Sequence, residues 1–195
     1  MQIDQLRAKH FPYTTRGGFT VRASTREEVT AVAEALFERI YPQNGEHARF
    51  VITAARREAM KSFYDHYSQL HHEWLLFCLA DGTPMGWMMG EMDNHNTFYM
   101  RNTGVLPEYQ GQGIYKELLE HMIAYLGELG YERISSHHLV TNNRIIITKL
   151  KQGFYFAGLE LTEQWGPMAK LVKILVKDRE DSFITQYGRF DHRQG

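Results

Sequence analysis

Two glycines that stand directly between a β-like run and an amphipathic helix constrain this chain more than any other feature. The run is Val105-Leu106-Pro107-Glu108-Tyr109-Gln110-Gly111-Gln112-Gly113-Ile114-Tyr115. Residues 97–100 upstream are rich in β-forming side chains, and Pro107 lacks the N–H that a continuing strand needs. Downstream, apolar residues recur at helical spacing until Gly130: Ile114, Leu118, Leu119, Met122, Ile123, Leu126 and Leu129. The two glycines therefore lie at a helix N-terminus, where free N–H groups and the helix dipole attract a phosphate.

A Gly-x-Gly pair is also typical of a plain flexible turn between a strand and a helix, and both interpretations fit the local segment. Two competing phosphate-binding motifs are excluded. No Gly-Lys-Ser/Thr ending follows the glycines, as a P-loop requires. Lys116 stands where the third glycine of a dinucleotide-binding Gly-x-Gly-x-x-Gly would be.

A second segment lies downstream of the glycine loop. Residues 131–140 read as a strand, and the next fourteen residues run from Thr141-Asn142 to Gly153-Phe154. At this point the chain resembles the GNAT N-acetyltransferase superfamily. Gln110-Gly111-Gln112-Gly113 matches that family's Arg/Gln-x-x-Gly-x-Gly/Ala loop, which cradles the pyrophosphate of coenzyme A, and Asn142 and Gly153-Phe154 match its later helix. The hairpin-like residues 80–87 also fit, so the resemblance covers about residues 19–177.

The resemblance implies an α/β (α+β) fold in one domain, residues 1–195, with a mixed central sheet flanked by helices. Residues 178–195 are polar and are expected to form a surface extension. Strands are expected at 19–22, 73–80, 83–94, 97–106, 131–140, 155–162 and 168–176. A Thr25 to Glu28 capping box predicts a helix that ends near Tyr41. A second helix is expected to bury one face, formed by Ile52, Ala55, Ala59, Phe63, Tyr67 and Leu70.

The resemblance also implies acetyl-coenzyme A as co-substrate. The residues expected to bind its phosphates through backbone or side-chain groups are Gln110, Gly111, Gln112, Gly113, Ile114, Tyr115 and Lys116. Tyr115 departs from the family, which has a small residue there. In the family the pantetheine arm pairs with the strand before the loop, which implicates Thr103 and Val105, and the backbone N–H of Val105 is the expected oxyanion donor. Asn142 is either a further contact of this cofactor or a plain N-cap.

An ammonium acceptor must lose a proton before it attacks, so a base or a chain of water molecules is required. His138 and Glu91 are the candidates. His137 and His138 end one strand and point to opposite faces, so at most one of the two faces the cleft. Arg101, in mid-strand, pairs either with an internal carboxylate such as Glu91 or with a carboxylate of the substrate.

The departing thiolate is protonated in many family members by a tyrosine, and Lys149 stands at that position here. A lysine there can donate a proton or hold a phosphate, but a solvated helix residue is the favoured interpretation. Tyr155 is the substitute proton donor, and water can also serve. The pair His71-His72 is expected at the surface. Neither histidine pair has a third ligand at metal-binding spacing, so no metal site is expected.

Composition narrows the remaining classes. A formal net charge of −1 over 195 residues argues against a nucleic-acid partner. The single cysteine, Cys78, excludes an internal disulfide and reads as a small buried hydrophobe. No apolar run fits a signal peptide or a membrane span, so the expected location is the cytoplasm.

The function expected is acetyl transfer from acetyl-coenzyme A to a primary amine of a small molecule, amino acid or peptide, by direct attack in a ternary complex. The missing tyrosine favours an alternative, a non-catalytic acyl-CoA-binding module. An unrelated α/β binding protein is a third interpretation. A homodimer is possible, and acceptor specificity is expected in residues 48–70 and 161–168.

Overall fold

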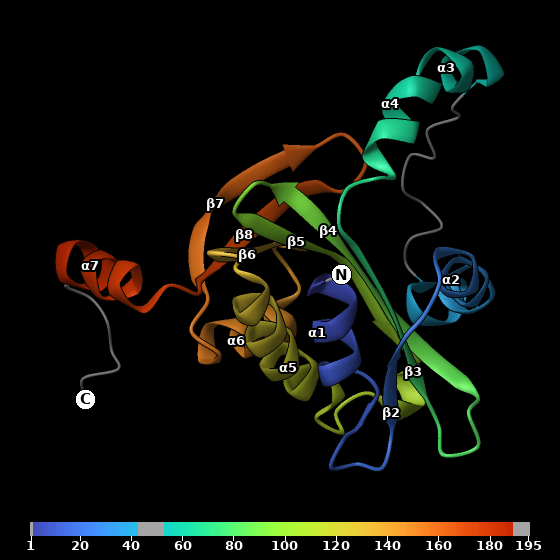
Figure 1. The fold of residues 1–195 in the computed structure, drawn as a ribbon, viewed down its shortest axis with the longest axis horizontal. Helices are drawn as coiled ribbons and strands as arrows, with labels where there is room; N and C mark the ends of the chain where they lie inside the picture. The colour runs from blue at the N-terminus through green and yellow to red at the C-terminus, as the bar shows by residue number, and fades with distance from the viewer. Residues whose placement is uncertain (1, 43–52, 189–195) are drawn as a thin grey trace.

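The computed structural model describes residues 2–42 and 53–188 (Figure 1). Its helices are α1 (Gln2–His10), α2 (Arg26–Ile40), α3 (Ala54–Ala59), α4 (Lys61–Tyr67), α5 (Ile114–Leu129), α6 (Asn143–Lys151) and α7 (Lys177–Tyr187), with a 3-10 turn at Pro107–Tyr109. Its strands are β1 (Tyr13–Thr14), β2 (Thr20–Ala23), β3 (His72–Cys78), β4 (Pro84–Asn94), β5 (Thr97–Val105), β6 (Arg133–Leu139), β7 (Tyr155–Thr162) and β8 (Gly166–Ile174).

The strands form one mixed sheet in the order β1-β2-β3-β4-β5-β6-β8-β7. Every neighbouring pair is antiparallel except β5 and β6, which are parallel and are joined by the crossover helix α5. The predicted fold class, a mixed sheet flanked by helices, is confirmed. Each predicted strand is present within a few residues of its expected bounds.

The parallel pairing of β5 with β6 is short. It covers only Thr97 to Tyr99 against Arg133 to Ser135, although both strands continue. Close to where the pairing ends, Gly90 pairs with Met100 and Met89 with Asn102, so Arg101 is one extra residue, a β-bulge. A bulge bends its strand. The two central strands therefore separate after Tyr99 and Ser135 and leave a fork that opens toward the glycine loop.

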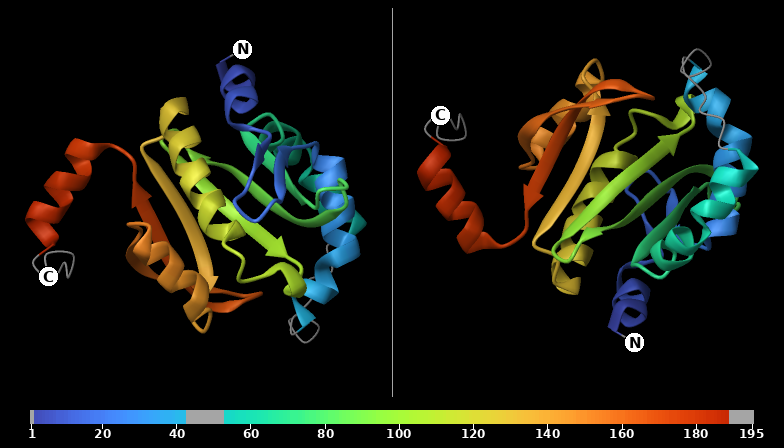
Figure 2. Two further views of the ribbon diagram at one scale, coloured as in Figure 1. Left: turned by 90° about the horizontal axis from the view of Figure 1, so that it is seen from below. Right: turned by 90° about the horizontal axis from the view of Figure 1, so that it is seen from above.

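The main hydrophobic core lies between the sheet and α5, which crosses one face (Figure 2). The apolar positions of α5 are buried as their spacing predicts: Ile114, Leu118, Leu119, Met122, Tyr125 and Leu126. Gly130 ends the helix in a left-handed conformation, with φ of 95°, that other residues adopt at a cost. α6 lies on this same face, because its Lys149 contacts Met100 of the main core.

The opposite face carries α2, which packs over β3 and β4 through a smaller core of Val29, Ala33, Leu76, Cys78 and Trp87. Cys78 is buried there, as expected. Thr25 caps α2 by accepting a hydrogen bond from the Glu28 N–H at 3.2 Å, which confirms the helix start predicted from the capping box.

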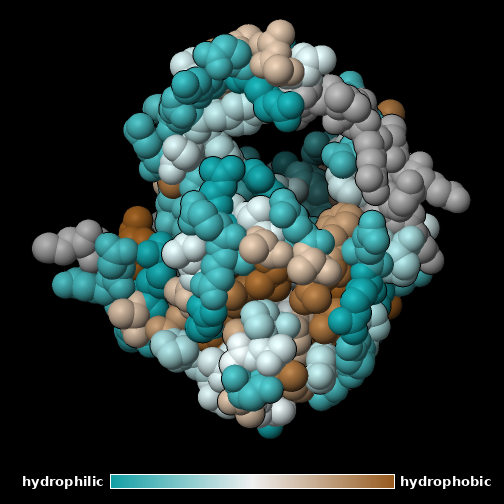
Figure 3. Space-filling model, turned by 90° about the vertical axis from the view of Figure 1, so that its right-hand side faces the viewer, coloured by the Kyte–Doolittle hydropathy of each residue, from teal (hydrophilic) through white to brown (hydrophobic). Residues whose placement is uncertain are grey.

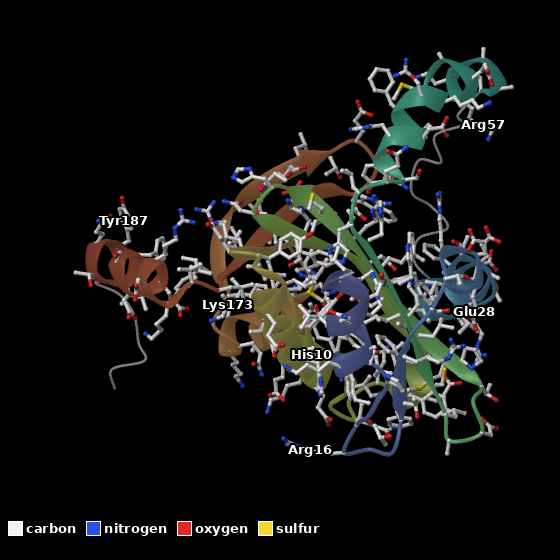
Figure 4. All side chains as sticks on the ribbon, viewed as in Figure 1. His10, Arg16, Glu28, Arg57, Lys173 and Tyr187 are labelled. Carbon is white, nitrogen blue, oxygen red and sulfur yellow. The ribbon has the colours of Figure 1, made fainter. Side chains whose placement is uncertain are left out.

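The predicted second helix is wrong in part. The segment is two short helices, α3 and α4, that meet at Met60 and bury no residue. Phe63 is 67% exposed, although its spacing had predicted a core position. Ile52 lies outside the described residues. The segment stands above a hollow on the side shown in Figure 3, with mostly hydrophilic side chains outward, and Arg57 points away from the sheet (Figure 4). Periodicity indicated a helical face here, but no partner element covers it.

The sequence pattern did not predict the secondary structure at the two ends of the described chain. α1 and β1 were not predicted, and α1 packs against α5. The polar segment after residue 177 forms α7, which buries no residue and lies apart from the main body (Figures 1 and 4). Lys173 and Tyr155 hold it through Glu180, at 3.1 and 3.3 Å. Residues 189–195 of the expected extension lie outside the described residues.

A buried carboxylate ties α1 to the sheet. Glu73 is 1% exposed and accepts hydrogen bonds from Arg7 Nε, at 3.0 Å, and from Tyr125. His71 Nε2 lies 2.6 Å from the same carboxylate, and its Nδ1 is 2.8 Å from the Tyr131 hydroxyl. Burial raises the pKa of Glu73, but the bonds from His71, Arg7 and Tyr125 outweigh it and hold the pKa below its usual value. The surface position expected for His71 is therefore wrong.

Candidate active site

The glycine loop has the geometry that an anion-binding loop needs. Gly111 and Gly113 have φ of 83° and 84°, in the left-handed region that favours glycine. Gly113 is the N-cap of α5, and no side chain caps that helix end. A Cβ at Gly111 would lie 3.1 Å from Arg144 Nη2. The helix N-terminus is thus reached by backbone and by a guanidinium, which fits a bound phosphate.

Arg144 was not among the expected cofactor-binding residues. It stands on the first turn of α6, and the sequence offered no signal that this helix returns to the glycine loop. Because its guanidinium reaches Gly111, it adds positive charge to the glycine loop. Lys116 is also near the loop, 58% exposed and 3.8 Å from Glu120.

The other loop side chains are engaged within the chain. Gln110 Nε2 donates to the Val105 carbonyl at 2.8 Å, and Gln112 Nε2 donates to the Glu108 carbonyl at 3.3 Å. In this structure, the side chains of Gln110 and Gln112 therefore stabilise the conformation of the loop. Tyr115 is half-buried against the main core, and burial raises the pKa of its hydroxyl.

The end of β5 presents backbone groups to the fork. Leu106 N–H donates to Met85 of β4 at 2.9 Å, and alternate peptide groups point to opposite edges of a strand, so Val105 N–H is directed toward the fork. The Thr103 carbonyl accepts from the Tyr41 hydroxyl at 2.7 Å. An extended ligand pairing with Thr103 and Val105 would use their N–H groups or displace Tyr41 and Gln110.

Asn142 is the N-cap of α6: its Oδ1 accepts from Ile145 N–H at 3.4 Å. The predicted N-cap role of Asn142 is therefore confirmed. Its position at the start of α6, two residues before Arg144, leaves a cofactor contact as a proposal.

Lys149 is the largest departure from the expected site. It is not solvated but 0% exposed, and its Nζ donates to Ser136 Oγ at 2.7 Å. The same nitrogen lies 3.8 Å from Met100 Sδ and 4.3 Å from the centre of the Phe154 ring. Burial lowers the pKa of Lys149 to about 7. The expectation of a solvated residue failed because α6 turns this position, one turn before Gly153, toward the sheet.

The neighbouring histidines of β6 occupy opposite faces. His138 faces α6, where its Nε2 lies 3.0 Å from Ser136 Oγ. Burial, with the nearby charge of Lys149, lowers the pKa of His138 to about 3. Such a ring is a weak base for an ammonium.

His137 lies on the other face, beside Tyr99, with ring centres 5.4 Å apart. Its Nε2 is 3.0 Å from Glu160 Oε2, a charge contact without aligned hydrogen-bond geometry. Burial lowers the pKa of His137 from its usual value, and Glu160 opposes that shift. The ring is therefore neutral near pH 7 and only 16% exposed.

Arg101 and Glu91 pair with each other. Arg101 Nε donates to Glu91 Oε1 at 2.8 Å, and Nη2 bonds both Glu91 and the Tyr67 hydroxyl. The internal partner expected for Arg101 is present, but Arg101 is not deeply buried, since its side chain is 46% exposed. Glu91 is 6% exposed, and its carboxylate is paired with Arg101. Its carboxylate is therefore poorly placed to take a proton from a substrate.

A cavity of about 770 Å³ opens beside Arg101 and is lined also by Tyr67, His72, Trp74 and Arg26. Tyr155, the expected substitute acid, is not brought to the fork. Its ring packs on Phe183 of α7 and its hydroxyl bonds Glu180. In the described part of the chain, no group of three or more His, Cys, Asp or Glu residues is arranged to hold a metal ion.

Comparison with known proteins places this site in a family. The model of the acetyltransferase (GNAT) family matches residues 30–154, and the chain belongs to this family. No curated protein sequence matches it. Within residues 2–42 and 53–188, no helix has the length and apolar character to cross a membrane.

Solved structures share the fold at low identity. A protein described as an acetyltransferase of Acinetobacter baylyi has a TM-score of 0.60 and 16% identity, over 80% of this chain and 92% of its own. A phosphinothricin N-acetyltransferase has a TM-score of 0.59 and 16% identity, over 81% and 99%. The spermidine N-acetyltransferase of Vibrio cholerae, solved with CoA and spermine, has a TM-score of 0.58 and 16% identity, over 80% and 95%. These likenesses show the shared fold, and the family match supports acetyltransferase activity.

Proposed function

We propose that this enzyme transfers the acetyl group of acetyl-coenzyme A to a primary amine of a small molecule, amino acid or peptide, in a ternary complex. The observation that carries the proposal is the glycine loop: two left-handed glycines open α5 directly beside an unpaired stretch of β5. The N–H groups after Gly113, with Arg144, would hold the diphosphate. The N–H groups of Thr103 and Val105 would align the arm along β5.

The position of the oxyanion contact follows from the length of the open strand. Val105 lies at the loop end of the fork, and Met100 lies five residues closer to its apex, about 17 Å along an extended strand. A thioester carried to the apex would present its carbonyl to the peptide N–H groups around the bulge at Arg101. We therefore assign Val105 to holding the arm and the bulge to polarising the carbonyl.

The acceptor amine would approach from the face that carries Tyr99 and the cavity beside Arg101. On that face His137 is the neutral base that the fork offers, with Glu160 stabilising the imidazolium that forms when it takes a proton. His138 and Glu91 are poorer candidates, because the first faces α6 and the second is neutralised by Arg101. The free amine then attacks the carbonyl carbon.

Calorimetry with acetyl-coenzyme A tests the binding step. Gly113→Val adds a β-branched side chain at a left-handed position, so we expect at least tenfold weaker affinity. Gly127→Ala is the matched control on the same helix, since a Cβ there meets nothing within 4 Å and affinity should be unchanged. No binding by the unaltered protein would overturn the proposal.

Thiol release from acetyl-coenzyme A, measured over a panel of primary amines, tests the transfer step. The panel should include amino acids, peptides with free N-termini and polyamines. Turnover with any of them supports the proposal. Tight binding with no turnover on any amine would instead establish an acyl-CoA-binding module.

A further inference from the structure

The buried amine of Lys149 lies at the apex of the fork between the two central strands. Met100 is the first β5 residue beyond the last parallel pair, and Ser136 is the first β6 residue beyond it. The Lys149 Nζ contacts both, at 3.8 Å and 2.7 Å. A chain that enters at the glycine loop and follows β5 therefore ends beside this nitrogen.

We infer that Lys149 donates its proton to the coenzyme A sulfur as the thioester breaks, an inference that rests on the proposed function. The acceptor nitrogen forms the new C–N bond and releases one proton to solvent, while the C–S bond breaks and its electron pair passes to sulfur. One proton moves from the Lys149 ammonium to that sulfur. The lysine is left neutral, and the products are the amide and the free thiol.

The surroundings of Lys149 favour donation in this direction. No carboxylate shifts its pKa in the described residues, because burial is the sole cause of the shift. Burial lowers the pKa of this ammonium to about 7, near the value of about 8.5 for an ordinary thiol, so the ammonium is acidic enough to give its proton to a thiolate. The Phe154 ring stabilises the charged form through a cation–π contact.

Two groups hold Lys149 without competing for its charge. The Ser136 hydroxyl accepts from Nζ, and His138, 3.0 Å from that hydroxyl on its other side, is neutral. This chain of Lys149, Ser136 and His138 is closed on the α6 face, whereas the base His137 lies on the opposite face. The proton donor and the proton acceptor are thus separated by the strand itself.

The ionisation of bound coenzyme A tests the inference without turnover. The ultraviolet absorbance of the thiolate is titrated with free reduced coenzyme A bound to the protein. We expect the thiol and Lys149 to titrate as a coupled pair, so that thiolate absorbance appears about one unit below the pKa of free coenzyme A, because the thiolate in turn keeps the lysine protonated. Lys149→Met should remove this decrease while coenzyme A still binds. Lys151→Met, an exposed neighbour on α6, is the control and should leave it unchanged.

Turnover gives a second readout. The unaltered enzyme should lose rate above pH 7 as Lys149 loses its proton. Lys149→Met should lower kcat about 10²-fold with little change in KM for acetyl-coenzyme A, and should abolish this loss of rate. Lys149→Arg, always charged, should also abolish that loss. Equal thiol pKa values in the unaltered protein and Lys149→Met would overturn the inference and leave the proposed function standing. Failure of coenzyme A to bind at all would overturn both.

Discussion

Replacing Lys149 by methionine should change how the stability of the protein depends on pH. In the folded chain the pKa of Lys149 is about 7, against 10.5 for an ordinary lysine. Between those values the unfolded chain binds a proton that the folded chain has lost, so the free energy of unfolding rises with pH. At pH 7 the buried lysine lowers it by about 4 kcal/mol relative to strongly alkaline solution.

About half of that rise in the free energy of unfolding lies in a pH range where the protein can be measured. Between pH 7 and pH 9 the lysine should contribute an increase of about 2 kcal/mol, which Lys149→Met lacks. Urea denaturation of both proteins at several pH values between 7 and 9 measures the difference, and all other titrating groups cancel in it. The advantage of the methionine variant should be largest at pH 7 and shrink as pH rises.

The reasoning has a clear point of failure. If the stabilities of the two proteins stay parallel across this range, Lys149 is not desolvated in solution and its pKa is ordinary. Lys151→Met serves as the reference, because that side chain is exposed and its removal should leave the pH dependence unchanged.

Three further outcomes follow from contacts described above. Glu73→Gln should lower the free energy of unfolding by about 3–5 kcal/mol in urea denaturation, because it leaves the Arg7 guanidinium without its buried carboxylate partner; a loss below 1 kcal/mol would contradict this. Gly86→Ala should cost about 1–3 kcal/mol by the same assay, since its Cβ would lie 2.3 Å from the Gly104 carbonyl oxygen, and an unchanged midpoint would show that the strands can move apart. His137→Gln should lower kcat about 10²-fold at neutral pH and remove the decline of rate toward acid, whereas His138→Gln should keep that decline; the reverse pattern would exchange the two assignments.

Much of the fold could be read from the sequence because its signals are local. The strand, glycine and helix order around Gly113, the capping box at Thr25 and the hairpin in residues 80–87 each depend on neighbouring residues alone. The failures depend on contacts distant in sequence. The spacing of Phe63 and Tyr67 indicated a buried face, but burial requires a partner element, which no local pattern reveals. The helix α1 has little amphipathic character, and Arg7 is held by Glu73, 66 residues away.

The site divides in the same way. The loop glycines could be predicted because a left-handed backbone conformation strongly favours glycine. The roles of His137, Lys149 and Arg144 depend on which face or which distant loop each side chain reaches. Strand alternation predicted that the two histidines diverge, but only the position of α6 shows which one is enclosed. The homodimer and the cytoplasmic location remain predictions.

The placement of the two histidines has a consequence for how this protein tolerates change. A single-residue insertion or deletion early in β6 would rotate both rings through the sheet, since side chains on a strand alternate. The imidazole beside Tyr99 would move beneath α6, and the one beneath α6 would move to the face that carries Tyr99. Such a mutation would change the length by one residue and keep the overall fold, yet it would exchange the positions of His137 and His138. Length conservation in this short strand should therefore be stricter than identity at most of its positions.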